Sequence, residues 1–176
     1  MRTLTLLTVI VVVSGNLIAQ TSSAAARAQE LAASFNKFKS VSKTKYGVTR
    51  AKYKDVHCEP LVRQGVKDYA GVYEAEGLGY VIELRVENDG AITGAGYANG
   101  SLSFTLENGK IEAGLLTAAR IYQNGTREKF EGVFVTRTDK ESPTDPGVTT
   151  TGLGVHLSVP VEIAGSTYER LFYQRR

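Results

Sequence analysis

Apolar and charged residues alternate over residues 80–87 in the way expected of a strand with one buried face. Four apolar residues occupy alternate positions and would share that face: Tyr80, Ile82, Leu84 and Val86. The Asn-Asp-Gly sequence at 88–90 then provides residues that tolerate positive φ angles, as tight hairpin turns require. The pattern therefore predicts an antiparallel hairpin over residues 79–96.

Similar patterns recur from residue 69 onward and predict eight strands. Their ranges are 69–74, 79–88, 91–97, 101–107, 110–122, 128–137, 152–160 and 167–174. Asn-Gly pairs at 99–100, 108–109 and 124–125 favour tight turns, so we expect an antiparallel meander. Residues 139–152 contain two prolines and no apolar periodicity, which predicts a mobile loop.

Eight meandering strands can close on themselves, which removes exposed edges, or fold into two packed sheets. We favour a mostly β fold in which a small closed or nearly closed barrel follows one N-terminal helix. An outer-membrane barrel is disfavoured because Glu, Arg and Lys recur regularly on the outer face of the predicted strands.

The stretch "DYAGVYEAEG" at the first strand, the eight-strand count and the Asn-Gly hairpins resemble the lipocalin-like group of small exported barrels. The resemblance covers residues 68–176 and implies a barrel, but it assigns no ligand-binding residue. The lipocalin opening with its Trp is not present, because the chain contains no Trp.

The predicted barrel interior is rich in bulky side chains, and eight strands enclose a space that side chains just fill. We therefore expect a packed core. Small residues on the same predicted face leave room either for large neighbours or for a cavity. The hypothetical pocket for a small apolar ligand comprises Gly94, Gly96, Ala113, Gly132, Phe104 and Phe130.

The first 19 residues have the layout of a secretory signal peptide. Arg2 precedes an apolar run over residues 4–13, and Ala19 offers a small residue at a cleavage site. The run falls short of the roughly 20 apolar residues that a membrane span needs. We expect cleavage before Gln20, leaving a secreted or periplasmic protein without a transmembrane span.

Charge divides the rest of the chain into two regions. Residues 37–67 carry nine basic and two acidic side chains, a net charge of +7, whereas residues 68–176 carry ten basic and fifteen acidic side chains, a net charge of −5. We interpret residues 20–67 as a helix and basic linker, and residues 68–176 as the barrel domain. The linker is expected to be a solvated, partly extended connection.

The expected helix lies before the basic segment. Five apolar residues recur there at helical spacing: Ala24, Ala28, Leu31, Phe35 and Phe38. Their stripe is narrow, and we expect it to pack against the barrel domain.

A field of one sign concentrates oppositely charged partners, so the basic segment predicts an anionic envelope partner such as lipid headgroups or an acidic glycan. The residues expected to form this surface are Lys43, Lys45, Arg50, Lys52 and Lys54. A nucleic acid is not expected as the partner of an exported protein.

The sequence contains no phosphate loop, no Ser elbow and no metal-ligand spacing, so we expect neither enzymatic activity nor a cofactor or metal. Cys58 has no intrachain partner and is expected to be buried, free or paired between chains. A catalytic pair of Cys58 with the adjacent His57 is not expected, because neighbouring residues on a strand point to opposite sides. His156 is expected to be solvated rather than to act as a ligand. Two alternatives stay open: a structural or protein-interaction module of the envelope, and a hydrolase that uses the carboxylates of Glu74 and Glu76.

Overall fold

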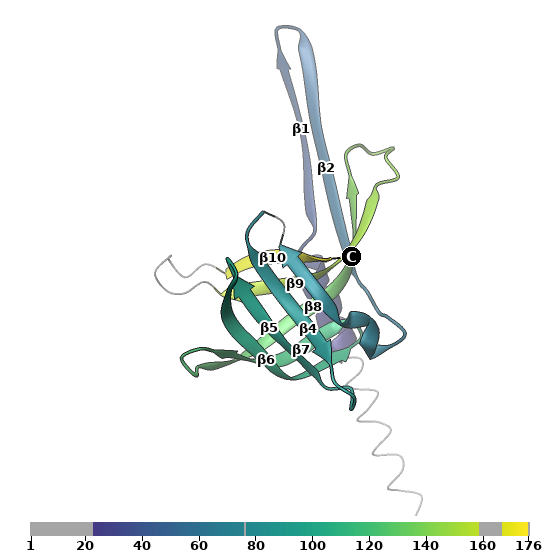
Figure 1. Ribbon diagram of the computed structural model, residues 1–176. Coiled ribbons are helices and arrows are strands. Elements are labelled where there is room, and N and C mark those ends of the chain that lie inside the picture. The colour runs from purple at the N-terminus through teal and green to yellow at the C-terminus, as the bar shows by residue number, and fades with distance from the viewer. Residues whose placement is uncertain (1–22, 76, 159–166, 176) are drawn as a thin grey trace, which may run out of the picture.

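A computed structural model describes residues 23–75, 77–158 and 167–175 (Figure 1). Eight of its antiparallel strands close into a barrel, preceded by a helix over residues 23–33, so the predicted fold class is confirmed. The predicted signal peptide lies outside the described residues. Within the described part of the chain, no helix combines the length and hydropathy needed to cross a membrane.

The barrel strands follow one another around its wall. They are β3 (Gly71–Ala75), β4 (Tyr80–Val86), β5 (Ile92–Ala98), β6 (Ser101–Glu112), β7 (Leu115–Tyr122), β8 (Arg127–Lys140), β9 (Val148–Ser158) and β10 (Thr167–Gln174). Consecutive strands from β3 to β10 are paired, and a β3–β10 pairing closes the barrel. A short 3₁₀ helix, η1 (Val66–Tyr69), leads into β3.

Apolar side chains fill the barrel interior. Ile82 and Leu84 are buried as the alternation predicted, whereas Tyr80 at the strand end is 39% exposed. The same core cluster contains four phenylalanines: Phe104, Phe130, Phe134 and Phe172. Buried apolar area of this kind is the main stabilising contribution to folding, and it forms the packed core that the sequence predicted.

The helix over residues 23–33 covers part of the outer wall. Ala28, Leu31 and Phe35 are buried against apolar residues that β2, β7 and β8 contribute, which confirms the predicted packing of the stripe. A Cβ at Gly154 would lie 2.6 Å from the Phe35 ring, so this glycine lets the ring approach the wall. Phe38, expected on the helix, lies instead in β1 and is 71% exposed.

One Asn-Gly pair does not form the turn that the sequence predicted. Asn108 and Gly109 lie inside β6, where the register with β7 shifts between Glu107 and Lys110. A Cβ at Gly109 would lie 2.6 Å from the Cβ of Ile92 on β5. The Asn-Gly pair therefore forms a β-bulge and allows β5 and β6 to approach closely. The hairpin turn comes later, at residues 113–114.

The predicted mobile loop is shorter than expected. β8 continues to Lys140 and β9 begins at Val148, so residues 141–147 connect them. Asp145 accepts hydrogen bonds from the backbone N–H groups of Glu141 and Gly147 at 3.0 and 2.9 Å. These bonds to the backbone also lower the pKa of the Asp145 carboxyl.

The basic linker is a β-hairpin rather than an extended connection. It consists of β1 (Lys37–Lys45) and β2 (Val48–Pro60), and Figure 1 shows it projecting beyond the barrel. On one edge of β8, β7 pairs as far as Val133 and β2 pairs from Val135 onward, with β9 on the other edge. The hairpin is therefore joined to the barrel through the long strand β8. We call residues 37–56 the ribbon.

Candidate anion-binding ribbon

All five residues predicted to meet an anionic partner belong to the ribbon. Its register places five pairs of positions on one face: Lys37 with Val56, Lys39 with Lys54, Val41 with Lys52, Lys43 with Arg50, and Lys45 with Val48. Seven of these ten positions are basic. We call this surface the cationic face.

The opposite face of the ribbon differs in charge. It pairs Phe38 with Asp55, Ser40 with Tyr53, Ser42 with Ala51, and Thr44 with Thr49. Its only charged position is Asp55, which lies near the barrel. The ribbon is therefore a two-stranded sheet with one strongly basic face and one mostly uncharged face.

Like charges lie directly opposite each other on the cationic face. Lys39 is paired with Lys54, an arrangement that destabilises a sheet relative to neutral pairs. Within the described residues, no carboxylate lies within 4.0 Å of an ammonium group of the ribbon lysines. Among the described residues, this charge is thus uncompensated along β1, whose side chains are all exposed.

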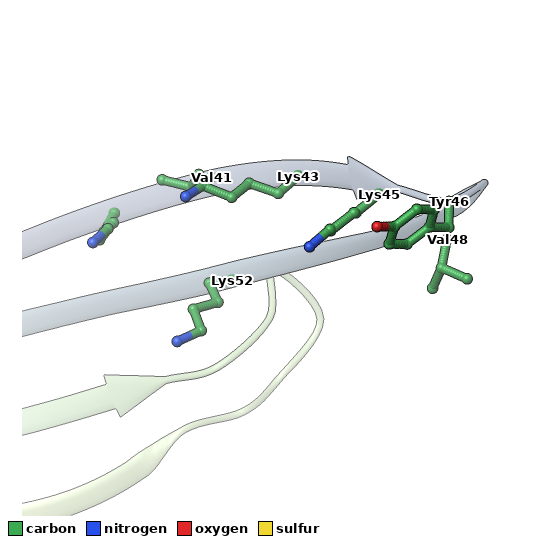
Figure 2. A pocket seen from close by; sticks show the side chains of 7 residues that line it. Val41, Lys43, Lys45, Tyr46, Val48 and Lys52 are labelled. Carbon is green, nitrogen blue, oxygen red and sulfur yellow. The ribbon is translucent and has the colours of Figure 1, made fainter.

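The cationic face bears an open groove of about 900 Å³. Figure 2 shows side chains along it, which come from both strands and the turn. The lining residues are Lys39, Val41, Lys43, Lys45, Tyr46, Val48 and Lys52. Val41 lies between Lys39 and Lys43 on β1, and Val48 lies opposite Lys45 at the tip, so the groove offers apolar surface as well as positive charge.

The turn at the ribbon tip presents an aromatic side chain. Tyr46 and Gly47 have φ angles of 54° and 76°, in the left-handed region that two-residue hairpin turns use. This conformation is uncommon for a bulky residue. Tyr46 is 91% exposed, and the Lys45 Nζ atom lies 5.1 Å from the centroid of its ring.

A second hollow, of about 290 Å³, lies where the ribbon meets the barrel. Lys37 and Lys54 line it from the ribbon, and Arg137, Arg170 and Tyr173 line it from β8 and β10. Sequence reasoning did not identify this group, because its members lie far apart in the chain.

The period-two recurrence of lysine in "KFKSVSKTK" was the one signal that could have revealed the ribbon.

The residues of the hypothetical apolar pocket are not all together. A Cβ at Gly96 would lie 2.1 Å from the Phe104 ring, and one at Gly132 would lie 3.0 Å from Leu153. A Cβ at Gly94 would meet the backbone instead, at 2.4 Å from the Glu83 carbonyl oxygen. The space beside these glycines is thus occupied by the protein.

The other two members of the hypothetical pocket differ in position. Phe130 is buried in the core cluster, whereas Ala113 lies in the β6–β7 turn with a φ of 51° rather than on a strand face. Binding of an apolar ligand remains a prediction.

The cysteine and the two histidines differ in burial and in their partners. Cys58 is buried and unpaired, and burial raises the pKa of its thiol, whereas the exposed His57 contacts Glu59 at 3.1 Å. His156, expected to be solvated, lies half-buried 3.0 Å from the Ser34 hydroxyl.

The carboxylate pair considered for hydrolysis is only partly described. Glu74 forms an ion pair with Arg175 at 2.7 Å, and Glu76 lies outside the described residues.

Comparison of the chain with protein-family models, with curated proteins and with solved structures gave no match. Functional inference therefore depends on the geometry of the ribbon and barrel.

Proposed function

We propose that the protein is an exported, non-enzymatic β-barrel that binds an anionic component of the cell envelope through the cationic face of its ribbon. The observation that carries this proposal is the register, which collects seven basic positions on one face of two paired strands. The barrel serves as the scaffold from which the ribbon projects.

Charge spacing supports collective binding. Successive rows on the face are two residues apart, which corresponds to about 7 Å along a strand. This spacing is below the Debye length of about 8 Å at physiological salt, so neighbouring rows act on one partner together. An anionic partner would also offset the like-charge pairing of Lys39 with Lys54.

The direct test measures retention on vesicles containing anionic lipid and on an acidic polysaccharide resin, with neutral vesicles as the reference. We expect retention that weakens steeply as salt increases. The variant with Lys43, Lys45, Lys52 and Lys54 each changed to Gln should lose most of it, because four charges leave one face. Absence of retention on every anionic support would refute the proposal.

A matched control removes the same number of charges from the barrel. Arg85, Lys110, Arg127 and Lys129 are exposed, and changing each to Gln leaves the ribbon intact. This variant should retain most of the binding. Equal losses in both variants would mean that net charge, rather than the cationic face, governs attachment.

Export belongs to the same proposal and is supported by the apolar run over residues 4–13. Mass spectrometry of the protein recovered from its native compartment should find a chain that starts near Gln20. A folded, localised protein that retains Met1 would contradict export by signal cleavage.

A further inference from the structure

The hollow at the ribbon base extends the cationic face toward the barrel. Lys37 and Lys54 belong to both, since they occupy the last basic positions of the face and line the hollow. Four of the described residues that line it are basic and none carries a carboxylate. Basic side chains therefore line the surface from the ribbon tip to the barrel wall.

Arg137 differs from the ribbon lysines because its neighbours fix its side chain. Its Nε and Nη2 atoms donate to the two carboxylate oxygens of Asp139 at 2.5 and 2.6 Å, and its Nη1 atom donates to the Tyr173 hydroxyl. These hydrogen bonds to Asp139 raise the pKa of the guanidinium. A guanidinium has five donors, so two are left for another acceptor. The side chain is 17% exposed and is thus pre-organised at the edge of the hollow.

The shape of the groove and the adjoining hollow suits a linear polymer better than a bilayer. The nine residues of β1 span about 30 Å. The groove along them extends to Lys39, and the neighbouring positions of the face, Lys37 and Lys54, line the hollow against the barrel wall. A planar membrane surface would touch the rims of such a groove but would not fill the hollow at its end. A single extended polymer can follow both.

The side chains of the cationic face favour a polymer without bases. Single-stranded nucleic acids bind through aromatic side chains on which successive bases stack. Here Val41 and Val48 line the groove, while Phe38 and Tyr53 lie on the opposite face with their ring centroids 5.7 Å apart. Of the described residues that line the groove, Tyr46 at the tip is the one that is aromatic.

We propose that the partner is a linear acidic glycan, and that one of its anionic groups occupies the hollow beside Lys37, Lys54 and Arg137. This inference rests on the proposed function of the ribbon and adds the partner's chemistry and a subsite. The lysines pair with charges along the chain, and the valines contact the apolar faces of its sugars. The held guanidinium of Arg137 offers a carboxylate or phosphate donors in a fixed geometry.

The experiment compares two double variants that each remove two charges from the same exposed face. Lys37→Gln/Lys54→Gln alters the hollow, and Lys43→Gln/Lys45→Gln alters the tip. Binding of oligogalacturonates of graded length is measured by calorimetry at two salt concentrations. We expect the hollow variant to lose about tenfold more affinity than the tip variant. The reason is that hydrogen bonds between charged groups in a formed site contribute more binding free energy than screened attraction at the exposed tip. Equal losses would overturn the subsite.

Further probes test the class of partner. Wild-type affinity should increase with glycan length until the chain spans the ribbon, and polyglycerol phosphate tests whether phosphate replaces carboxylate. An oligonucleotide of equal charge and vesicles of anionic lipid should bind more weakly than the glycans. Tighter binding to vesicles would overturn the glycan assignment while leaving the proposed function intact. Failure of every anionic probe would overturn both.

Discussion

The barrel and the ribbon use the same antiparallel pairing, but their side chains have different surroundings. Barrel strands bury one face, as Ile82 and Leu84 do on β4. Their cations are commonly paired, as when the buried Arg120 contacts Glu128 at 2.6 Å. In the ribbon, every side chain of β1 is exposed and its lysines have no carboxylate partner among the described residues.

This difference concerns which contacts stabilise each region. An isolated two-stranded hairpin is at best marginally stable in water, and this one is supported where β2 pairs with β8. Its like-charge pairs reduce that stability further. The barrel sequence is explained by contacts inside the chain, whereas the ribbon sequence would be explained by the proposed contact with an anionic partner.

The largest expected effect is the loss of a barrel phenylalanine. Phe104→Ala should lower the free energy of unfolding by about 3 to 5 kcal/mol, because the side chain is buried in the core cluster. Glu83→Ala, on the outward side of β4, should lower it by less than about 0.5 kcal/mol. Denaturant melts of both variants measure the contrast. Equal effects would contradict the face assignment.

A smaller effect tests whether the barrel has spare room. Gly96→Ala places a Cβ 2.1 Å from the Phe104 ring, and the resulting overpacking should cost about 1 to 3 kcal/mol of unfolding free energy. Adding Phe104→Leu should recover part of that loss. If Gly96→Ala is neutral in denaturant melts, the space is open and a ligand pocket regains support.

The structure bears out what local alternation could reveal. The eight strands of the barrel, the burial of Ile82 and Leu84 and the packing of the helix all follow from period-two and helical spacing. The turn at residues 113–114 did not follow, because it places Ala113 at positive φ. Tertiary contact explains it, since the Gly114 carbonyl accepts from Phe134 N at 2.8 Å and a Cβ at Gly114 would meet Leu61.

The ribbon could not be predicted from apolar periodicity, because its alternation is between lysine and uncharged residues. Lys37, Lys39 and Lys43 are separated by multiples of two residues, so they would share one face of a strand. This pattern indicates a strand only if charged residues, rather than apolar ones, are taken to define the face. The base hollow could not be predicted at all. It requires the β2–β8 register and the β10 position, which bring Arg137 and Tyr173 to Lys54.

Alkaline pH should weaken the barrel through Tyr73. Burial raises the pKa of this phenol to about 12, and its hydroxyl donates to the Tyr69 carbonyl at 2.8 Å. Because the folded state holds the proton more tightly, the stabilisation is complete below about pH 10 and is lost as pH rises toward 12. Denaturation midpoints should fall across that range, and less steeply in Tyr73→Phe. Burial also raises the pKa of Tyr122, so some slope should persist. Identical slopes would exclude Tyr73 as a major contributor.

The smallest expected change in stability directly tests why the ribbon differs from the barrel. Lys54→Glu converts the like-charge pair with Lys39 into an opposite-charge pair, which should stabilise the ribbon by about 0.2 to 1 kcal/mol. Amide hydrogen exchange in β1 should then slow, while affinity for anionic supports should fall because the face loses two units of charge. Lys54→Gln is the matched control, with less protection and a smaller loss of binding. If Lys54→Glu slows exchange without weakening binding, the lysine row is not kept for an anionic partner, and the contrast between ribbon and barrel needs another cause.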